Sequence, residues 1–346
     1  MTAGHPPRPR SGGTASPNPA ADPASVAVER PFPWTADRLR VAYLYPGQGT
    51  QRPGMLHDLP DHPAVIATLA EAEQILPGSS RQDSAPALRS TVTTQVALCV
   101  AGVAVTRALA AEGATPDVVA GHSAGAFAAA VAAGALTFAE ALIAVRHRGE
   151  LMRDAYPCGY GMAAVLGLGV AQVRRVVASA ATDADPLYVA VIDTDQMVVV
   201  SGGVRALERL SAESSRAGAR RVQRLDIGVP SHCPLLGHVA EVMADHLAAI
   251  PRRRLTVPFI GGAGRLLRDT DTVLADLAHG IATTVRWRDA NALLGELGTA
   301  LFIQTPPGHV LAGFARAAHP YARCVTLSDT PIAEAALLTR HARTGT

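Results

Sequence analysis

One serine in this chain has neighbours that favour chemistry. The stretch "VVAGHSAGAFAAAVAAGAL", residues 118–136, places Ser123 after an apolar run and within the pattern G-x-S-x-G. In this pattern a nucleophilic serine occupies a tight turn between a strand and a helix, and the residues two before and two after it must be small. The turn exposes the hydroxyl and aims the first N–H groups of the helix at an oxyanion. A Gly-Ser loop that only caps a helix is the alternative, and the strand–helix context favours the nucleophile.

A serine nucleophile needs a general base, and the chain has 12 histidines. Histidines in polar or turn-like surroundings are expected at the surface: His5, His57, His62, His279 and His341. His122 belongs to the turn itself, and its side chain should point away from that of Ser123. His232, in "GVPSHCPLLGH", follows a turn set by Pro230 and precedes an apolar helix. It is the candidate base, with a helix-capping histidine as the alternative.

Composition excludes several other functions. The chain has 48% hydrophobic and 17% charged residues and a net charge of +2. This composition does not predict binding to nucleic acid or to an anionic membrane. All 31 basic residues are arginine, which excludes a lysine nucleophile or Schiff base. The scattered cysteines form no C-x-x-C pair, so we expect reduced thiols in a cytoplasmic protein, without a metal site.

The elements around Ser123 read as an α/β protein. A buried strand is expected at residues 41–45, helices at 62–76 and 90–113, a strand before Ser123 and a helix directly after it. Ser90 or Thr91 is a plausible cap of the second helix. A further helix should begin after Thr137, with Glu140 completing a capping box.

Two segments differ from this α/β pattern of strands and helices. Residues 1–37 are rich in Pro and Ala and lack the apolar core of a signal peptide, so we expect a disordered tail. Residues 159–227 read as β-α-β-β-α-β, the order of a ferredoxin-like unit. This unit should be an inserted small domain between the two parts of a large α/β domain, residues 38–158 and 228–335.

Motifs spread along the chain resemble one family. "YPGQGTQRPGM", "GHSAGAFAAAVAAGALTFAEALIAVRHRGELM", "GYGMAAVLGL", "VPSHC" and "PPGHVLAGF" occur in this order. Together they are similar to the malonyl-CoA:acyl-carrier-protein transacylases, over about residues 38–328. The resemblance implies an α/β-hydrolase-like large domain with an inserted ferredoxin-like small domain, which agrees with the elements above.

The resemblance also implies roles for particular residues. Ser123 and His232 would form a catalytic dyad, and the backbone N–H groups of Gln48 and Ala124 would form the oxyanion hole. Arg148 stands at the family's position for the arginine that holds the malonyl carboxylate. Its neighbours Arg146 and Arg153 would be solvated.

The chain departs from the family pattern at several positions. Gly280 replaces a glutamine whose backbone carbonyl orients the histidine, a role that glycine can still fill. Asp193 replaces an asparagine of the small domain, and because a carboxylate there could repel malonyl, we expect it to lie outside the site. "QTPPG", residues 304–308, is interpreted as a loop change.

A finer resemblance concerns the acceptor. Four motifs, "QRPGMLHDLP", "STVTTQVALCVAGVA", "AYPCGYGMAAVLGL" and "VPSHCPLL", look closer to the transacylase (epsilon) subunit of biotin-independent malonate decarboxylase than to the fatty-acid enzyme. The expected function is malonyl transfer from malonyl-CoA to an acyl-carrier protein, with the malonate decarboxylase carrier subunit favoured. No cofactor would be bound; the carrier would bring a phosphopantetheine-type arm. A transacylase of fatty-acid or polyketide synthesis is the alternative, and a serine hydrolase or thioesterase belongs to another reaction class.

Overall fold

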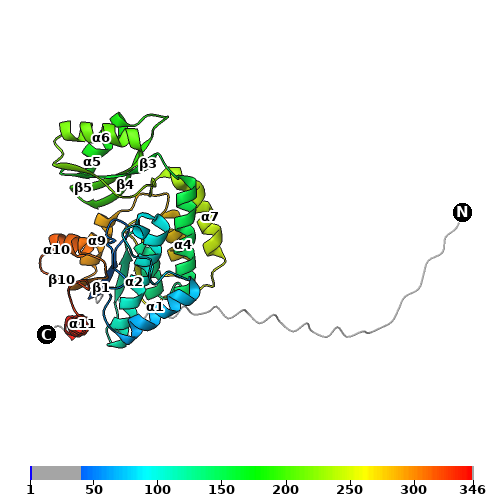
Figure 1. Ribbon diagram of the computed structural model, residues 1–346, viewed down its shortest axis with the longest axis vertical. Coiled ribbons are helices and arrows are strands. Elements are labelled where there is room, and N and C mark those ends of the chain that lie inside the picture. The colour runs from blue at the N-terminus through cyan, green and yellow to red at the C-terminus, as the bar shows by residue number, and fades with distance from the viewer. Residues whose placement is uncertain (2–39, 345–346) are drawn as a thin grey trace. The chain divides into compact units, whose positions relative to one another are not determined.

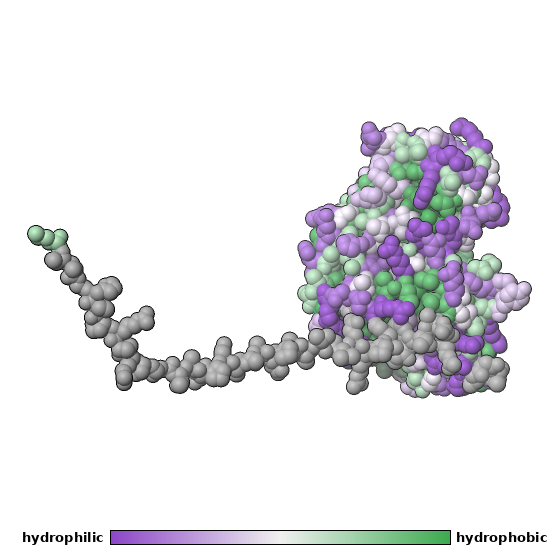
Figure 2. All heavy atoms as spheres, turned by 180° about the vertical axis from the view of Figure 1, so that it is seen from behind, coloured by the Kyte–Doolittle hydropathy of each residue, from purple (hydrophilic) through white to green (hydrophobic). Residues whose placement is uncertain are grey.

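The computed structural model describes residue 1 and residues 40–344. The tail predicted over residues 1–37 lies, apart from its first residue, outside this described part. On the face seen in Figure 2, hydrophilic side chains cover most of the described surface around smaller hydrophobic patches. The main apolar cluster lies inside, around the buried side chains of β1.

The larger sheet has the strand order β10-β9-β1-β2-β7-β8, and Figure 1 labels two of its strands, β1 and β10. Its strands are β1 (Val41–Tyr45), β2 (Val118–Gly121), β7 (Phe259–Ile260), β8 (Leu266–Leu267), β9 (Leu301–Gln304) and β10 (Arg323–Thr326). Neighbouring strands are parallel except β7 and β8. All residues of β1 and β2 are buried, as expected for parallel strands that are covered on both faces.

Helices cover this sheet and supply most of the core. They are α1 (Pro63–Ile75), α2 (Thr91–Ala111), α3 (Gly125–Ala132), α4 (Phe138–Ala155), α7 (Gly237–Ala248), α8 (Thr270–His279), α9 (Trp287–Glu296), α10 (Val310–Ala318) and α11 (Ile332–Thr344), with 3-10 turns at Ala87–Arg89 and Pro234–Leu236. Ser90 caps α2, and Thr137 with Glu140 forms the predicted capping box of α4. By length and composition α2 could cross a membrane, but 78% of its apolar window is buried in the structure, as in a core helix.

The smaller sheet is antiparallel and has its own apolar core. Its elements are β3 (Tyr160–Leu166), α5 (Val170–Ala180), β4 (Leu187–Thr194), β5 (Met197–Gly203), α6 (Val204–Arg216) and β6 (Arg221–Arg224), with the strand order β4-β5-β3-β6. The predicted fold class, an α/β unit with a βαββαβ unit inserted in it, is thereby confirmed. The exact domain boundaries remain a prediction.

Main-chain hydrogen bonds join the smaller sheet to the rest of the molecule. Val285, which precedes α9, donates its N–H to the Ala190 carbonyl of β4 at 2.9 Å, and its own carbonyl accepts from the N–H of Ile192 at 2.8 Å. The hydroxyl of Thr284 donates to the Val189 carbonyl at 2.8 Å. Strand β4 is therefore hydrogen-bonded on both sides, to β5 on one side and to the segment before α9 on the other.

Candidate active site

The turn that carries Ser123 has the predicted strand–turn–helix form. Strand β2 ends at Gly121, Ser123 has a φ of 54°, and α3 begins at Gly125. A Cβ on Gly121 would lie 2.3 Å from the Cα of Ala126, and one on Gly125 would lie 2.2 Å from the Tyr45 carbonyl oxygen. Both positions therefore require glycine, which explains the small residues of the motif.

His232 lies directly against this serine, although 109 positions separate the two in the chain. Its Nε2 is 2.7 Å from Ser123 Oγ, and its Nδ1 is 2.6 Å from the Gly280 carbonyl oxygen. A carbonyl can only accept, so Nδ1 carries the proton and Nε2 is left to accept the serine proton. Burial, and next the cationic Arg148, lower the pKa of His232 to about 3. The imidazole is therefore neutral near pH 7, which is the state that a general base needs.

The two expected oxyanion donors lie beside the serine. Gln48 lines the same cleft as Ser123, and a Cβ on the preceding Gly47 would lie 2.5 Å from the His122 carbonyl oxygen, so this loop packs against the turn. Among residues 40–344, neither the backbone N–H of Gln48 nor that of Ala124 donates to another group. Both donors are thus free for an oxyanion.

Arg148 reaches the serine from α4. Its side chain is buried, with 2% exposure; Nη2 lies 3.4 Å from Ser123 Oγ, and Nη1 donates to the amide oxygen of Gln95. Within the described residues no carboxylate lies within ion-pair distance of it. Burial lowers the pKa of Arg148 to about 10, so the guanidinium is cationic near pH 7. A buried cation without an anionic partner is costly unless a ligand supplies one.

A chain of polar side chains holds this arginine. The Gln95 amide donates to Thr91 Oγ1 at 3.0 Å, and the Thr91 hydroxyl donates to Gln48 Oε1 at 2.9 Å. Sequence reasoning missed Gln95 and Thr91, because both look like ordinary residues near the start of α2. The expectation for Arg146 and Arg153 agrees with the structure, since both are exposed and pair with neighbouring acids.

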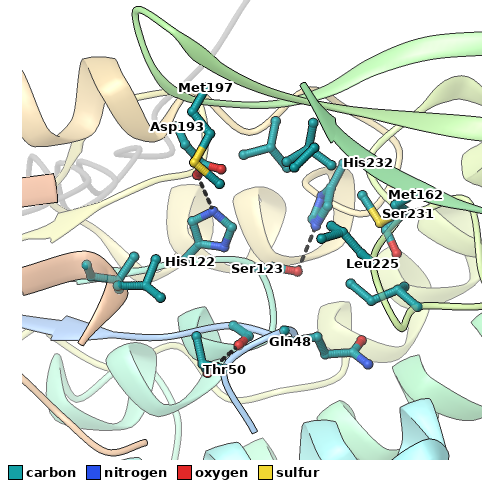
Figure 3. Close-up of a pocket in the computed structure, with 18 of the residues that line it drawn as sticks. Gln48, Thr50, His122, Ser123, Met162, Asp193, Met197, Leu225, Ser231 and His232 are labelled. Carbon is teal, nitrogen blue, oxygen red and sulfur yellow. Dashed lines mark hydrogen bonds and ion pairs between the residues drawn. The ribbon is translucent and has the colours of Figure 1, made fainter. Parts of the chain in front are cut away.

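The cleft between the two sheets contains a further His–Asp contact that was not expected there (Figure 3). Asp193, which we expected to lie outside the site, lines the same cleft as Ser123 and His232. His122 directs its Nε2 to within 3.1 Å of Asp193 Oδ1, whereas Ser123 Oγ faces His232. The expectation for Asp193 was wrong because β4 folds over the turn, a tertiary contact that local sequence does not report.

The remaining lining of the cleft is mostly apolar. It comes from the smaller sheet, from the segment after β6 and from α10: Met162, Ala164, Val191, Met197, Val199, Leu225, Ile227, Val310, Leu311 and Phe314. Among residues 40–344, no group of three or more His, Cys, Asp or Glu side chains could hold a metal ion.

Comparisons with known proteins assign this chain to a class of enzymes. The sequence profile of the acyl transferase domain matches residues 42–338. The chain therefore belongs to the acyl transferase family, and the resemblance inferred from the motifs is confirmed at this level.

Several similar proteins of this family are named as malonyl transacylases. The chain is 31% identical to the malonyl CoA-acyl carrier protein transacylase of Bacillus subtilis (strain 168), over 87% of this chain and 97% of the relative. The structure of the corresponding transacylase from Coxiella burnetii matches with a TM-score of 0.81 and 30% identity, over 89% of this chain and 98% of that one. A type II PKS acyl-carrier protein in complex with its malonyl-transacylase gives a TM-score of 0.81 and 30% identity, over 89% and 100% of the two chains.

Proposed function

We propose that this acyltransferase moves a malonyl group from malonyl-CoA to the thiol of an acyl-carrier protein, through a malonyl ester of Ser123. The observation that carries the proposal is the placement of Arg148 Nη2 only 3.4 Å from the oxygen of a serine that is paired with a neutral histidine. A nucleophile beside a buried, unpaired guanidinium fits an acyl group that ends in a carboxylate.

The first half-reaction forms the acyl-serine. Ser123 Oγ attacks the thioester carbonyl carbon while His232 Nε2 takes the hydroxyl proton. The C–S bond then breaks, and the imidazolium returns the proton to the departing CoA thiolate. The Gly280 carbonyl keeps the Nδ1 proton in place, so that Nε2 alone exchanges protons.

The second half-reaction reverses these steps with a new thiol. The carrier's phosphopantetheine-type thiol loses its proton to His232 Nε2, and the sulfur attacks the ester carbonyl carbon. The C–O bond to Ser123 breaks, and Oγ recovers the proton from the imidazolium. In both halves the N–H groups of Gln48 and Ala124 would stabilise the oxyanion, and one such donor is typically worth about 3–4 kcal/mol.

The proposal also specifies which carrier protein accepts the malonyl group. The similar proteins reported above are named as transacylases acting with acyl-carrier proteins, which favours a carrier of that type over the malonate decarboxylase carrier that the finer motif resemblance indicated. A carbonyl oxygen, rather than a carboxylate, faces His232 Nδ1, which argues against a Ser–His–Asp hydrolase.

The test is a half-reaction followed by a choice of acceptors. Incubation with malonyl-CoA should give a malonyl adduct on Ser123 by peptide mass spectrometry, and none in Ser123→Ala. The adduct should then pass to a phosphopantetheinylated acyl-carrier protein faster than to water. Transfer only to a malonate decarboxylase carrier would assign the chain to that complex instead. Rapid CoA release without any carrier would indicate a hydrolase and refute the proposal.

A further inference from the structure

The cleft poses an electrostatic problem. Asp193 is buried, with 6% exposure, and lines the cavity that contains Ser123 and His232. If the proposed function is correct, an acyl group with its own carboxylate must enter the same cavity. Two like charges a few ångströms apart in a partly dry site repel each other strongly.

Asp193 has little freedom to move away. It follows Ile192, whose N–H donates to the Val285 carbonyl at 2.8 Å, so this end of β4 is fixed to the larger part of the molecule. The next residue, Thr194, pairs with Met197 of β5, so the strand remains in the smaller sheet beyond Asp193. The carboxylate must therefore be compensated where it stands.

His122 is placed to provide this compensation. Its Nε2 lies 3.1 Å from Asp193 Oδ1, and the ring packs at 5.4 Å from the ring of Trp287. On another side the ring approaches Gly47, where a Cβ would lie 3.1 Å from its Nδ1. The imidazole is thus held between the turn of Ser123 and the smaller sheet (Figure 3).

We propose that His122 compensates the Asp193 carboxylate through its Nε2, which lies 3.1 Å from Oδ1, and so allows the cleft to accept an anionic acyl group. This inference rests on the proposed malonyl transfer. It makes His122 and Asp193 a specificity-determining pair that touches neither the scissile bond nor the serine proton. The cation proposed to bind the substrate carboxylate remains Arg148; His122 reduces the repulsion between Asp193 and that carboxylate.

The test is a double-mutant cycle with two acyl donors. Wild type, H122Q, D193N and H122Q/D193N are compared for acylation of Ser123 from malonyl-CoA and from acetyl-CoA. H122Q should lower kcat/KM for malonyl-CoA by roughly tenfold or more, because it exposes the Asp193 charge, and should affect acetyl-CoA much less. In the D193N background the same histidine change should have only a small effect on malonyl-CoA.

Several results would overturn the inference. One is an equal loss with both donors in H122Q, which would indicate a general role in catalysis or folding. Another is a double variant as impaired with malonyl-CoA as H122Q. D193N alone should keep or raise the malonyl-to-acetyl ratio, and a fall of this ratio refutes the inference even if H122Q does not fold. If wild type itself fails to form malonyl-Ser123, the proposed function fails first, which separates the two outcomes.

Discussion

At the scale of single residues, we expect Arg148 to determine which acyl group the site prefers. It is buried on α4 and has neutral partners, Gln95 and Ser123. Arg148→Gln should lower kcat/KM for malonyl-CoA by about 100-fold, because a buried charge-assisted contact is worth about 2–5 kcal/mol. Acetyl-CoA should be affected far less.

A matched control for this prediction lies on the same helix. Arg146 is exposed and pairs with Glu150 at 2.8 Å, so Arg146→Gln should leave both donors nearly unchanged. Steady-state kinetics with the two acyl donors would check the pair of variants. A parallel loss of malonyl-CoA and acetyl-CoA activity in Arg148→Gln would count against a carboxylate-binding role.

His232 links the site to the pH dependence of stability. Its pKa in the folded protein, about 3, lies below the ordinary value of 6.5. The fold therefore favours the neutral ring: this contribution is complete above pH 6.5 and is lost as the pH falls towards 3. The loss should be about 1.4 kcal/mol of unfolding free energy per pH unit.

Urea unfolding at pH 7 and pH 5 would measure this loss. His232→Gln should remove the corresponding slope from the pH dependence. His238→Gln, at a position with 87% side-chain exposure, should keep the wild-type slope. Identical slopes in wild type and His232→Gln would show that the ring is not buried in its neutral form.

Residue patterns revealed some of these groups and concealed others. Ser123 could be predicted because a five-residue pattern contains its whole steric requirement. Arg148 and Gly280 required the family resemblance, since nothing local distinguishes them. Asp193 was misplaced because strand periodicity predicts which face a side chain occupies, but not which distant turn that face will cover.

At the scale of elements, the close contact between the serine turn and β1 is a steric requirement. A Cβ on Gly125, the first residue of α3, would meet the Tyr45 carbonyl oxygen at 2.2 Å, and this oxygen belongs to the backbone of the buried strand β1. Gly125→Ala should therefore lower the stability by roughly 3 kcal/mol or more and disorder the turn.

Gly313 provides the comparison for this variant. It lies within α10, and a Cβ there would meet no atom within 4 Å. Gly313→Ala should stabilise the protein by about 0.5–1 kcal/mol, because alanine favours the helix. Thermal unfolding of both variants would check the prediction, and similar Tm values for the two would contradict the steric account.

Elements with strong local signals were predictable, and short ones were not. The helices α2 and α4 begin at the expected caps, Ser90 and Thr137, because capping depends on residues within one turn. The strands β7 and β8 have two residues each, too few for a periodic pattern; β7 pairs with the distant β2, and β8 is an edge strand that pairs with β7.

At the scale of the whole molecule, activity should depend on how the smaller sheet is attached. Its core is separate from the main core, and the main-chain bonds of Val285 hold β4 near the serine. Val285→Pro removes the N–H that binds the Ala190 carbonyl. We expect KM for malonyl-CoA to rise about tenfold, because β4 carries part of the cleft wall.

Val285→Ala is the control, since it keeps both main-chain bonds and removes only side-chain packing. It should lower the Tm by a few degrees and leave KM within about threefold of wild type. Kinetics below the Tm of each variant would separate the two effects. A larger rise of KM in Val285→Ala than in Val285→Pro would show that packing, rather than the main-chain bridge, positions β4.

The buried guanidinium of Arg148, which has no carboxylate partner among the described residues, should also affect the stability of the protein. A fold that keeps an uncompensated positive charge inside is weaker when empty than when a small dianion fills the gap. Free malonate at a hundred times its dissociation constant should add about 2.7 kcal/mol to the unfolding free energy, and Arg148→Gln should abolish this gain. The supply of short dicarboxylates around the enzyme would then regulate how long each molecule survives unfolding and proteolysis.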